Sequence, residues 1–360
     1  MIEYNIGIIG AGNIAGKIAD TLKSMNGFDA YAIASRDPER AKTFAEEHNI
    51  TKVHSTYEEL MNDPDVDLVY IATVNSTHAD LARQCIDAGK PVFVEKPFSY
   101  NSKTVESLLD YAEEKQVFCS EAMWLRYNPL MRGICDQLRK GIIGDIRTIE
   151  AHIGYNLPGR ERLLKPELGG GALLDVGVYP ITAILMIMGA GPLQMAADPL
   201  LTNTGVDVYS TIYMRYPQGR VAVVTNTIMN ETGNKCIIYG THGRVEIDNI
   251  NNPMYIQVFG PDNKPREEMR PQNKEYNGYE YQFKAVRKAA IANKLETDEY
   301  PRIHMKELYR LTDSLRYTWN IMFPLPGEPE KRKGPQPQGP QGPQGPQGEQ
   351  TPSGAPKEDA

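Results

Sequence analysis

The regular alternation of two hydrophobic periods over the first 120 residues constrains the fold more than any other feature of the sequence. Short, almost continuously apolar runs of strand length alternate with longer segments that have the spacing of an amphipathic helix. The apolar runs are Ile6–Ile9, Tyr31–Ala34, Leu68–Ala72 and Val92–Val94, and the helical segments are Ile14–Met25, Pro38–His48, Thr77–Ala88 and Ser102–Lys115. Because strands without a polar face are buried on both sides, and strands joined through helices pair in parallel, residues 1–120 are predicted to form a doubly wound α/β domain.

A glycine-rich turn joins the first predicted strand to the first helix. Gly10 can form the tight turn, Gly12 lets the backbone approach a pyrophosphate, and Ala15 provides a small residue for helix–strand packing. Asn13 and Ile14 begin the helix, whose free N–H groups and positive dipole end attract phosphate. The turn is therefore predicted to bind a dinucleotide.

The end of the second strand distinguishes between the two nicotinamide dinucleotides. Ser35 and Arg36 stand where an NAD-selective site has a carboxylate, and Arg40 follows one helical turn later. A hydroxyl and guanidinium groups suit a 2′-phosphate. Asp37 precedes Pro38 and is better explained as the N-cap of the next helix. The sequence thus favours NADP(H), with NAD(H) possible, and the alternative is that Arg36 is merely solvated.

The pattern changes after residue 120. Segments of alternating polar and apolar residues follow at Ile146–Ile153, Val208–Tyr216, Arg220–Asn226, Lys235–Tyr239, Arg244–Ile247 and Met254–Phe259. Helices are predicted near Pro129–Lys140, Tyr279–Asn293 and Met305–Ile321. Residues 121–325 are therefore predicted to form a second α/β domain with an open, mainly antiparallel sheet. Residues 326–360, rich in Pro, Gly and Gln, lack the apolar residues needed to fold and are expected to be a disordered tail.

The composition argues against several other classes of protein. The 39 basic and 46 acidic side chains give a net charge of −7 without a basic stripe, so nucleic acid is not expected as a partner. No apolar run approaches the roughly 20 residues of a membrane helix, and the N-terminal segment lacks a secretory signal. The four cysteines and six histidines show no metal-ligand spacing, so no metal is assigned. We expect a cytoplasmic protein that acts on a small molecule.

Three further segments carry a family resemblance. They are Val94-Glu95-Lys96-Pro97, Glu121-Ala122-Met123-Trp124-Leu125-Arg126 and the run from Gly169 to Pro180. Together with the Gly10 turn, they resemble the glucose–fructose oxidoreductase / inositol dehydrogenase (Gfo/Idh/MocA) family, in the branch of the dimeric dihydrodiol dehydrogenases. The resemblance covers residues 4–323. It implies a Rossmann domain followed by an α/β domain whose open sheet forms the subunit interface of a homodimer or homotetramer.

The resemblance also implies an activity and a set of site residues. The activity is hydride transfer between NAD(P) and a sugar, polyol or cyclic trans-diol. Lys96 matches the family's catalytic lysine, and Glu95 and Pro97 match its neighbours at the nicotinamide ribose. Asp175 and Tyr179 match the two polar positions of the family's Asp-x-x-x-His/Tyr motif.

Further contacts are expected from position. Residues 73–78 resemble the family's cofactor loop, which implies contacts from Thr73, Asn75 and His78, although His78 could equally cap the helix that follows. Candidates for substrate contact, chosen from their place beside the motifs, are Trp124, Arg126, Tyr155 and Arg160, with Asn156 and Arg162 on the same loop.

The proposed chemistry leaves alternatives open. Free tyrosine has a pKa of about 10, and the Lys96 ammonium and the positive charge of the oxidised nicotinamide would both help Tyr179 to ionise as the proton-transfer group. Asp175 would orient Lys96 or the substrate, and Lys96 itself could donate the proton. Pro180 is expected to distort the helical segment near Gly177. The rival functions are a redox-neutral glycosidase or lyase that uses NAD transiently, and a non-catalytic NADP(H) sensor.

Overall fold

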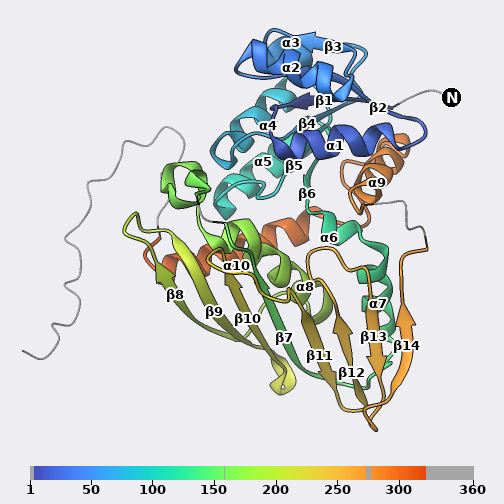
Figure 1. Ribbon diagram of the computed structural model, residues 1–360, viewed down its shortest axis with the longest axis vertical. Coiled ribbons are helices and arrows are strands. Elements are labelled where there is room, and N and C mark those ends of the chain that lie inside the picture. The colour runs from blue at the N-terminus through green and yellow to red at the C-terminus, as the bar shows by residue number, and fades with distance from the viewer. Residues whose placement is uncertain (1–3, 158, 273–276, 322–360) are drawn as a thin grey trace, which may run out of the picture. The chain divides into compact units, whose positions relative to one another are not determined.

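The computed structural model describes residues 4–157, 159–272 and 277–321, and the predicted tail at 326–360 lies outside them. The first sheet has six parallel strands in the order β3-β2-β1-β4-β5-β6 (Figure 1). Its strands are β1 (Tyr4–Ile9), β2 (Phe28–Ala34), β3 (Lys52–His54), β4 (Leu68–Ile71), β5 (Val92–Glu95) and β6 (Cys119–Ala122). Its helices are α1 (Asn13–Lys23), α2 (Pro38–His48), α3 (Tyr57–Met61), α4 (His78–Asp87) and α5 (Ser102–Glu114). The strand order reverses between β1 and β4, which is where doubly wound sheets bind ligands.

The four predicted strands and four predicted helices of this domain are present, whereas β3, α3 and β6 were not predicted. The expected boundary at residue 120 falls inside β6. The sequence of β6 is too polar to be recognised, since it includes Ser120 and Glu121. The fully buried Glu121 carboxylate is stabilised by Tyr300 and Tyr309, whose hydroxyls donate hydrogen bonds to it at 2.8 and 2.5 Å.

The second sheet has eight strands in the order β14-β13-β12-β11-β7-β10-β9-β8. The strands are β7 (Ile146–Gly154), β8 (Gln194–Leu201), β9 (Asp207–Arg215), β10 (Val221–Thr227), β11 (Cys236–Gly240), β12 (Gly243–Ile247), β13 (Ile256–Phe259) and β14 (Pro265–Met269). Only the pair β7–β10 is parallel. The mixed, mainly antiparallel sheet confirms the predicted fold class.

Helices cover one face of this second sheet (Figure 1). The helices after β6 are α6 (Trp124–Tyr127), α7 (Pro129–Arg139), α8 (Val178–Met188), α9 (Glu280–Ile291) and α10 (Arg302–Thr318). Helix α8 packs on β7 and β10, and α10 packs on both α8 and α5. Helix α9 returns to the first domain, where Phe283 packs 5.6 Å from the ring of Tyr70. The chain therefore crosses between its two sheets more than once.

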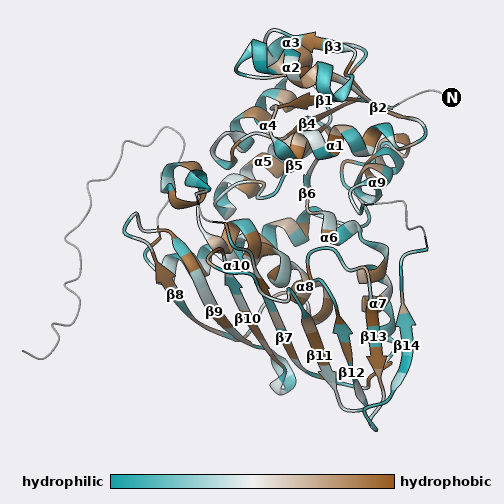
Figure 2. Ribbon diagram, in the orientation of Figure 1, coloured by the Kyte–Doolittle hydropathy of each residue, from teal (hydrophilic) through white to brown (hydrophobic). Residues whose placement is uncertain are grey.

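The two edge strands of the second sheet, β8 and β14, were not predicted. In β14 only Met269 is a large apolar residue, and Figure 2 colours this strand hydrophilic. In β8 the run contains Asp198 and Pro199, which are typical of a sheet edge rather than a central strand. Edge strands bury less side-chain surface, so they carry a weaker hydrophobic pattern.

One helical stretch passes a length and composition test for a membrane span. Within the described residues, Pro166–Met188 is long and apolar enough, and 83% of its most apolar window is buried inside the protein. A helix that is hydrophobic on all sides is found in the core of a large protein as well as in a membrane. Here the apolar surface of α8 packs on β7 and β10.

Candidate active site

A cleft of about 1410 Å³ lies along the carboxyl ends of the first sheet and reaches the start of α8. Its volume exceeds the roughly 300–1,000 Å³ of a site for one small molecule, so it has room for a dinucleotide with a second ligand. The predicted residues that line it are Gly10, Gly12, Asn13, Ile14, Ser35, Arg36, Arg40, Thr73, Asn75, His78, Glu95, Lys96, Trp124, Tyr155, Arg160, Asp175 and Tyr179. Pro97 and Arg126 are not part of its lining.

The glycine turn fits a pyrophosphate. Gly10 has φ +107°, and a Cβ at this position would lie 2.7 Å from the Ala72 carbonyl oxygen, so no side chain is accommodated. A Cβ at Gly12 would meet no protein atom within 4 Å, which leaves the backbone open to the cleft. Helix α1 has neither a side-chain cap nor an acidic residue in its first turn. Its first N–H groups are therefore available to an anion.

The end of β2 fits a phosphate on the adenosine ribose. Asp37 caps α2, because its carboxylate accepts hydrogen bonds from the backbone N–H groups of Glu39 and Arg40 at 3.1 and 3.3 Å. Arg36 and Arg40 line the cleft, and neither guanidinium has an ion-pair partner among the described residues. The local geometry thus agrees with the expected use of Asp37 as a cap and leaves both guanidinium groups free.

At the end of β5, three predicted catalytic residues meet. Lys96 Nζ donates a hydrogen bond to the backbone carbonyl of Asp175 at 2.6 Å, and it lies 3.5 Å from the Asp175 carboxylate. The same Nζ lies 5.2 Å from the centre of the Tyr179 ring. Arg162 Nη2 binds the Asp175 carboxylate at 2.9 Å. Asp175 is therefore shared between two cations.

A π-helical turn over Leu173–Gly177 precedes α8 and contains Asp175. Pro180, three residues beyond this turn, has no backbone N–H to donate. The Asp175 carbonyl accepts a hydrogen bond from Lys96 Nζ at 2.6 Å. The distortion expected near Gly177 thus takes the form of a π-helical turn.

The pKa values of two titratable groups of the site, Asp175 and Tyr179, are shifted in opposite directions. Burial raises the pKa of Asp175, but the positive charges of Lys96, Arg162 and Arg160 outweigh this effect and hold it below the usual value. Burial and the nearby Glu95 and Asp175 charges raise the pKa of Tyr179 well above its usual value. The expectation that Lys96 promotes the phenolate is therefore wrong for the free protein, because burial and two carboxylates oppose ionisation.

Glu95 is the group of this site that titrates near neutrality. Burial raises its pKa to about 7, although the Tyr70 hydroxyl and the Lys96 charge and N–H stabilise the carboxylate. The side chain is 7% exposed and adjoins Lys96. Its charge is therefore sensitive to small changes in pH around 7.

The loop between β4 and α4 connects the cleft to other parts of the site. The ring nitrogens of the buried His78 lie 2.8 Å from the Pro97 carbonyl and 3.2 Å from the Thr73 carbonyl. Burial lowers the pKa of His78, so the neutral ring has one N–H for these two acceptors. Asn75 Nδ2 donates to the carbonyl of Gly169 at 3.1 Å. These contacts join the predicted cofactor loop to the Lys96–Pro97 turn and to the glycine run.

Aromatic and amide side chains line the cleft beside Lys96, Asp175 and Tyr179. Trp124 stacks on Tyr279 with the ring centres 4.2 Å apart, and Asn251 Nδ2 donates to the Tyr155 hydroxyl at 2.9 Å. Sequence reasoning missed Tyr279 and Asn251, because neither belongs to a motif and both are brought to the cleft by distant segments.

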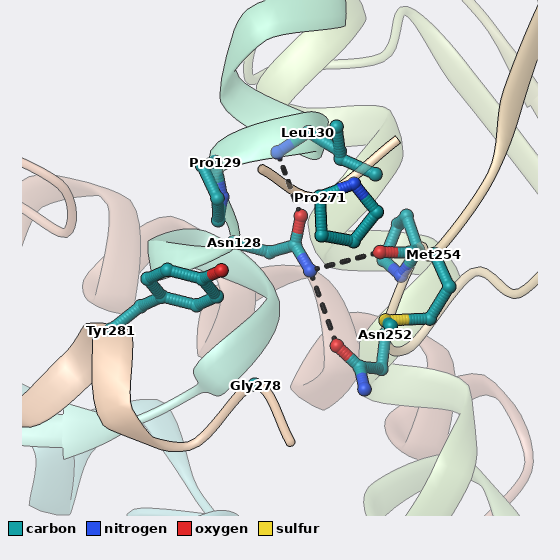
Figure 3. A pocket seen from close by; sticks show the side chains of 9 residues that line it. Asn128, Pro129, Leu130, Asn252, Met254, Pro271, Gly278 and Tyr281 are labelled. Carbon is teal, nitrogen blue, oxygen red and sulfur yellow. Dashed lines mark hydrogen bonds between the residues drawn. The ribbon is translucent and has the colours of Figure 1, made fainter. Parts of the chain in front are cut away.

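A small cavity lies next to the segment that carries Asn251 (Figure 3). Asn128 caps α7 by accepting hydrogen bonds from the N–H groups of Leu130 and Met131 at 2.9 and 3.1 Å. Its amide nitrogen donates to Asn252 and to the Pro253 carbonyl, each at 3.2 Å. The cavity measures about 10 Å³, which is room for no more than a water molecule. Its role is structural, since these contacts position the neighbouring wall of the cleft.

Arg126 occupies a different place from the one expected. It is 6% exposed, donates to the Glu299 carbonyl at 3.2 Å and lies 2.6 Å from His304 Nδ1. Its guanidinium also lies 4.9 Å from the centre of the Tyr300 ring. The expected contact with substrate is therefore wrong, because α6 directs this side chain toward α10 and the segment before it.

Comparisons with known proteins agree with this architecture. Residues 4–123 match the model of an oxidoreductase family with an NAD-binding Rossmann fold, and residues 131–246 match the GFO/IDH/MocA C-terminal domain. Trans-1,2-dihydrobenzene-1,2-diol dehydrogenase of Xenopus tropicalis is 37% identical over 262 residues, which are 72% of this chain and 79% of the relative. The enzyme of the same name from Mus musculus is 32% identical over 328 residues, or 88% of this chain and 97% of the relative.

A solved structure extends the comparison. The 3-ketoreductase KijD10 from Actinomadura kijaniata, in complex with NADP and TDP-benzene, is 26% identical with a TM-score of 0.79. The similarity covers 88% of this chain and 97% of the ketoreductase. The turn at Gly10 and Gly12 and the start of α1 form a dinucleotide cradle, as a member of this family requires. Because both domains match as well, the chain belongs to the GFO/IDH/MocA family of NAD(P)-binding oxidoreductases.

Proposed function

We propose that this protein is an NADP(H)-dependent oxidoreductase that interconverts a secondary alcohol and a ketone on a ring-shaped polyol, such as a sugar or a cyclic trans-diol. The observation that carries the proposal is the meeting of Lys96, Asp175 and Tyr179 in the cleft that also contains the dinucleotide cradle. A protein that only sensed the dinucleotide would need the cradle but not this group of residues.

The preference for NADP(H) is supported at the end of β2. Arg36 and Arg40 have no anionic partner among the described residues, and Asp37 is engaged as a helix cap. A 2′-phosphate would complete this arrangement through charge-assisted hydrogen bonds. The similar ketoreductase from Actinomadura kijaniata was solved with NADP bound. When bound, the nicotinamide ring supplies the hydride acceptor or donor.

The side chains around Lys96 handle the proton and orient the substrate. Because the pKa of Tyr179 is raised, its hydroxyl is protonated at neutral pH and can donate its proton to a carbonyl oxygen during reduction. The Lys96 ammonium, held by the Asp175 carbonyl, binds the same oxygen and stabilises developing negative charge. Arg162 keeps the Asp175 carboxylate in place.

The cleft wall supports a ring-shaped substrate. The stacked pair of Trp124 and Tyr279 presents flat apolar surface, and Tyr155 with Asn251 offers polar atoms beside it. Flat rings with hydroxyl groups match both kinds of surface. The relatives with this architecture include enzymes named for a dihydrobenzenediol and for a 3-keto substrate.

A substrate screen tests the proposal. Sugars, inositols and trans-cyclic diols are offered with NADP⁺ and with NAD⁺, and the absorbance of reduced nicotinamide is followed. We expect net formation of NADPH with at least one ring polyol, and slower turnover with NAD⁺. Turnover of substrate without net NADPH formation would instead indicate the redox-neutral reaction, and the absence of turnover with tight NADPH binding would indicate a sensor.

We also propose that the face of the second sheet that the helices of the described residues leave open joins copies of the chain into a homodimer or homotetramer. The side chains that alternate with the buried ones on β9, β10 and β11 include Tyr209, Tyr213, Val223 and Ile237, and each is only partly exposed. Such a surface is large and partly apolar. Light scattering is expected to give two or four times the chain mass of 40.3 kDa, and a monomer mass would contradict this proposal.

A further inference from the structure

We infer that the substrate carries an anionic group, a carboxylate or a phosphate, and that Arg160 and Arg162 bind it at the catalytic end of the cleft. The inference rests on the proposed function and narrows its substrate class. It excludes neutral diols and neutral sugars as the preferred substrates.

The two arginines lie on a segment that is anchored to both domains. The segment follows β7 and contains two short 3₁₀ turns, Glu161–Leu164 and Pro166–Leu168. Leu163, between the arginines and the second turn, is 1% exposed and packs in the core. At its end, the Gly169 carbonyl accepts the hydrogen bond from Asn75 of the cofactor loop. The segment therefore holds Arg160 and Arg162 against the cleft that they line.

The charges at this end of the cleft do not balance. Lys96 and Arg162 approach one oxygen of Asp175, at 3.5 and 2.9 Å, so a single carboxylate serves two cations. The Arg160 guanidinium adds a third positive charge and has no hydrogen-bond or ion-pair partner among the described residues. Glu95, a second carboxyl group beside Lys96, is buried, and burial raises its pKa to about 7, so it is only partly ionised at neutral pH and does not balance the three cations.

The acidic residue nearest in sequence does not compensate these cations. Glu161 stands between the two arginines, but its carboxylate binds Lys165 Nζ at 2.6 Å, and neither of these side chains lines the cleft. An anion that enters the cleft therefore finds two arginines with unused N–H groups. A guanidinium fork binds carboxylate and phosphate groups with two parallel hydrogen bonds, which a neutral hydroxyl cannot match.

The phosphates of the dinucleotide are the competing ligands for these arginines. They already have a cradle at Gly10, Gly12 and the start of α1, and a second one at Arg36 and Arg40. Arg162, by contrast, binds the residue that holds the catalytic Lys96. The unmatched charge thus lies beside the reacting atoms, where the substrate binds.

The experiment compares a neutral hexose with three anionic derivatives of the same ring: the uronate, the hexose phosphate and the nucleoside-diphosphate hexose. KM and kcat are measured with NADP⁺ for the unmodified protein, for Arg160→Gln and for the control Lys165→Gln. We expect at least one anionic derivative to have a KM about tenfold or more below that of the neutral hexose. The three derivatives separate a carboxylate from a phosphate and from a nucleotide as the source of the charge.

Arg160→Gln is expected to raise the KM of the anionic substrate about 10- to 100-fold, the effect of one charge-assisted hydrogen bond, with a smaller effect on kcat and an unchanged Kd of NADPH. Lys165→Gln is expected to leave both substrates unaffected, because its side chain does not line the cleft. Equal KM values for neutral and anionic rings would overturn the inference and leave the proposed function standing. A rise in the Kd of NADPH in Arg160→Gln would also overturn it and assign the arginine to the cofactor.

Calorimetry measures substrate binding directly, so it tests the inference even if no substrate is turned over. If no ring polyol is oxidised, the proposed function fails, but binding of each derivative to the NADP⁺-loaded protein is still measurable. We expect the anionic derivatives to bind and Arg160→Gln to weaken that binding. No binding preference for the anionic rings would overturn the inference as well.

Discussion

Replacing Tyr179 by Phe tests which group transfers the proton. The substitution removes only the hydroxyl, because the ring is 8% exposed and keeps its packing. The Lys96 ammonium stays above the ring face, 5.2 Å from its centre, and the contacts of Asp175 with Lys96 and Arg162 do not involve the hydroxyl. The variant therefore isolates the contribution of the proton donor.

The expected effects differ greatly in size. Loss of one neutral hydroxyl costs about 1 kcal/mol of folding stability or less. Loss of a positioned proton donor lowers kcat by about 10²–10⁴-fold, which corresponds to about 3–5 kcal/mol of transition-state stabilisation. Thermal melting and initial rates from NADPH absorbance measure the two quantities on the same preparation. Tyr155→Phe is the matched control, because Tyr155 also lines the cleft but its hydroxyl accepts a hydrogen bond from Asn251. We expect the kcat of this variant to stay within about tenfold of that of the unmodified protein.

The pH profile adds a second measurement. Because the pKa of Tyr179 is raised and that of Glu95 is about 7, an ionisation near neutrality in kcat/KM belongs to Glu95. It is expected to persist in Tyr179→Phe, with a lower rate at every pH. A Tyr179→Phe protein with the original kcat would refute this reasoning and assign the proton to Lys96.

Three further predictions concern neighbouring residues. Arg36→Asp is expected to reverse the preference for NADPH over NADH, because a carboxylate repels the 2′-phosphate, and equal Kd values for both cofactors in the unmodified protein would contradict the assignment of this site. Lys96→Met is expected to lower kcat by at least ~10²-fold with little change in the Kd of NADPH, since Asp175 keeps its bond to Arg162, and an unchanged kcat would make the lysine structural. Burial raises the pKa of Glu95 from its ordinary value of 4.5 to about 7, so its ionisation lowers stability as pH rises between these values. Glu95→Gln is expected to remove about 3 kcal/mol of that decline, and urea titrations in which both proteins show parallel pH dependence would rule this out.

The local features of the site were predictable from the sequence. The turn at Gly10 and Gly12 follows from a strand that enters a helix directly, and the capping role of Asp37 follows from the proline after it. The distortion before Pro180 follows from its missing N–H group. In each case the physical cause lies within a few residues of its effect, so the linear pattern contains all the information needed.

Only the tertiary structure shows which polar side chains are buried by segments distant in the sequence. Glu121 is buried in the edge strand β6 because tyrosines from α10 and the segment before it donate hydrogen bonds to its carboxylate, and no pattern within Cys119–Ala122 indicates those partners. Arg126 turns away from the cleft for a similar reason, because its partners lie more than 170 residues further along the chain.

The ionisation of Tyr179 also depends on tertiary structure. From the sequence, the positive charges of Lys96 and of the oxidised nicotinamide are expected to promote the Tyr179 phenolate. In the folded protein, burial and the charges of Glu95 and Asp175 act in the opposite direction. The sequence alone was sufficient to predict the chemical groups, the dinucleotide cradle and the alternation of strands and helices in the first domain. The tertiary structure decided which charges surround each group and how much water reaches it, because desolvation and electrostatic interactions depend on distances in space rather than on separation along the chain.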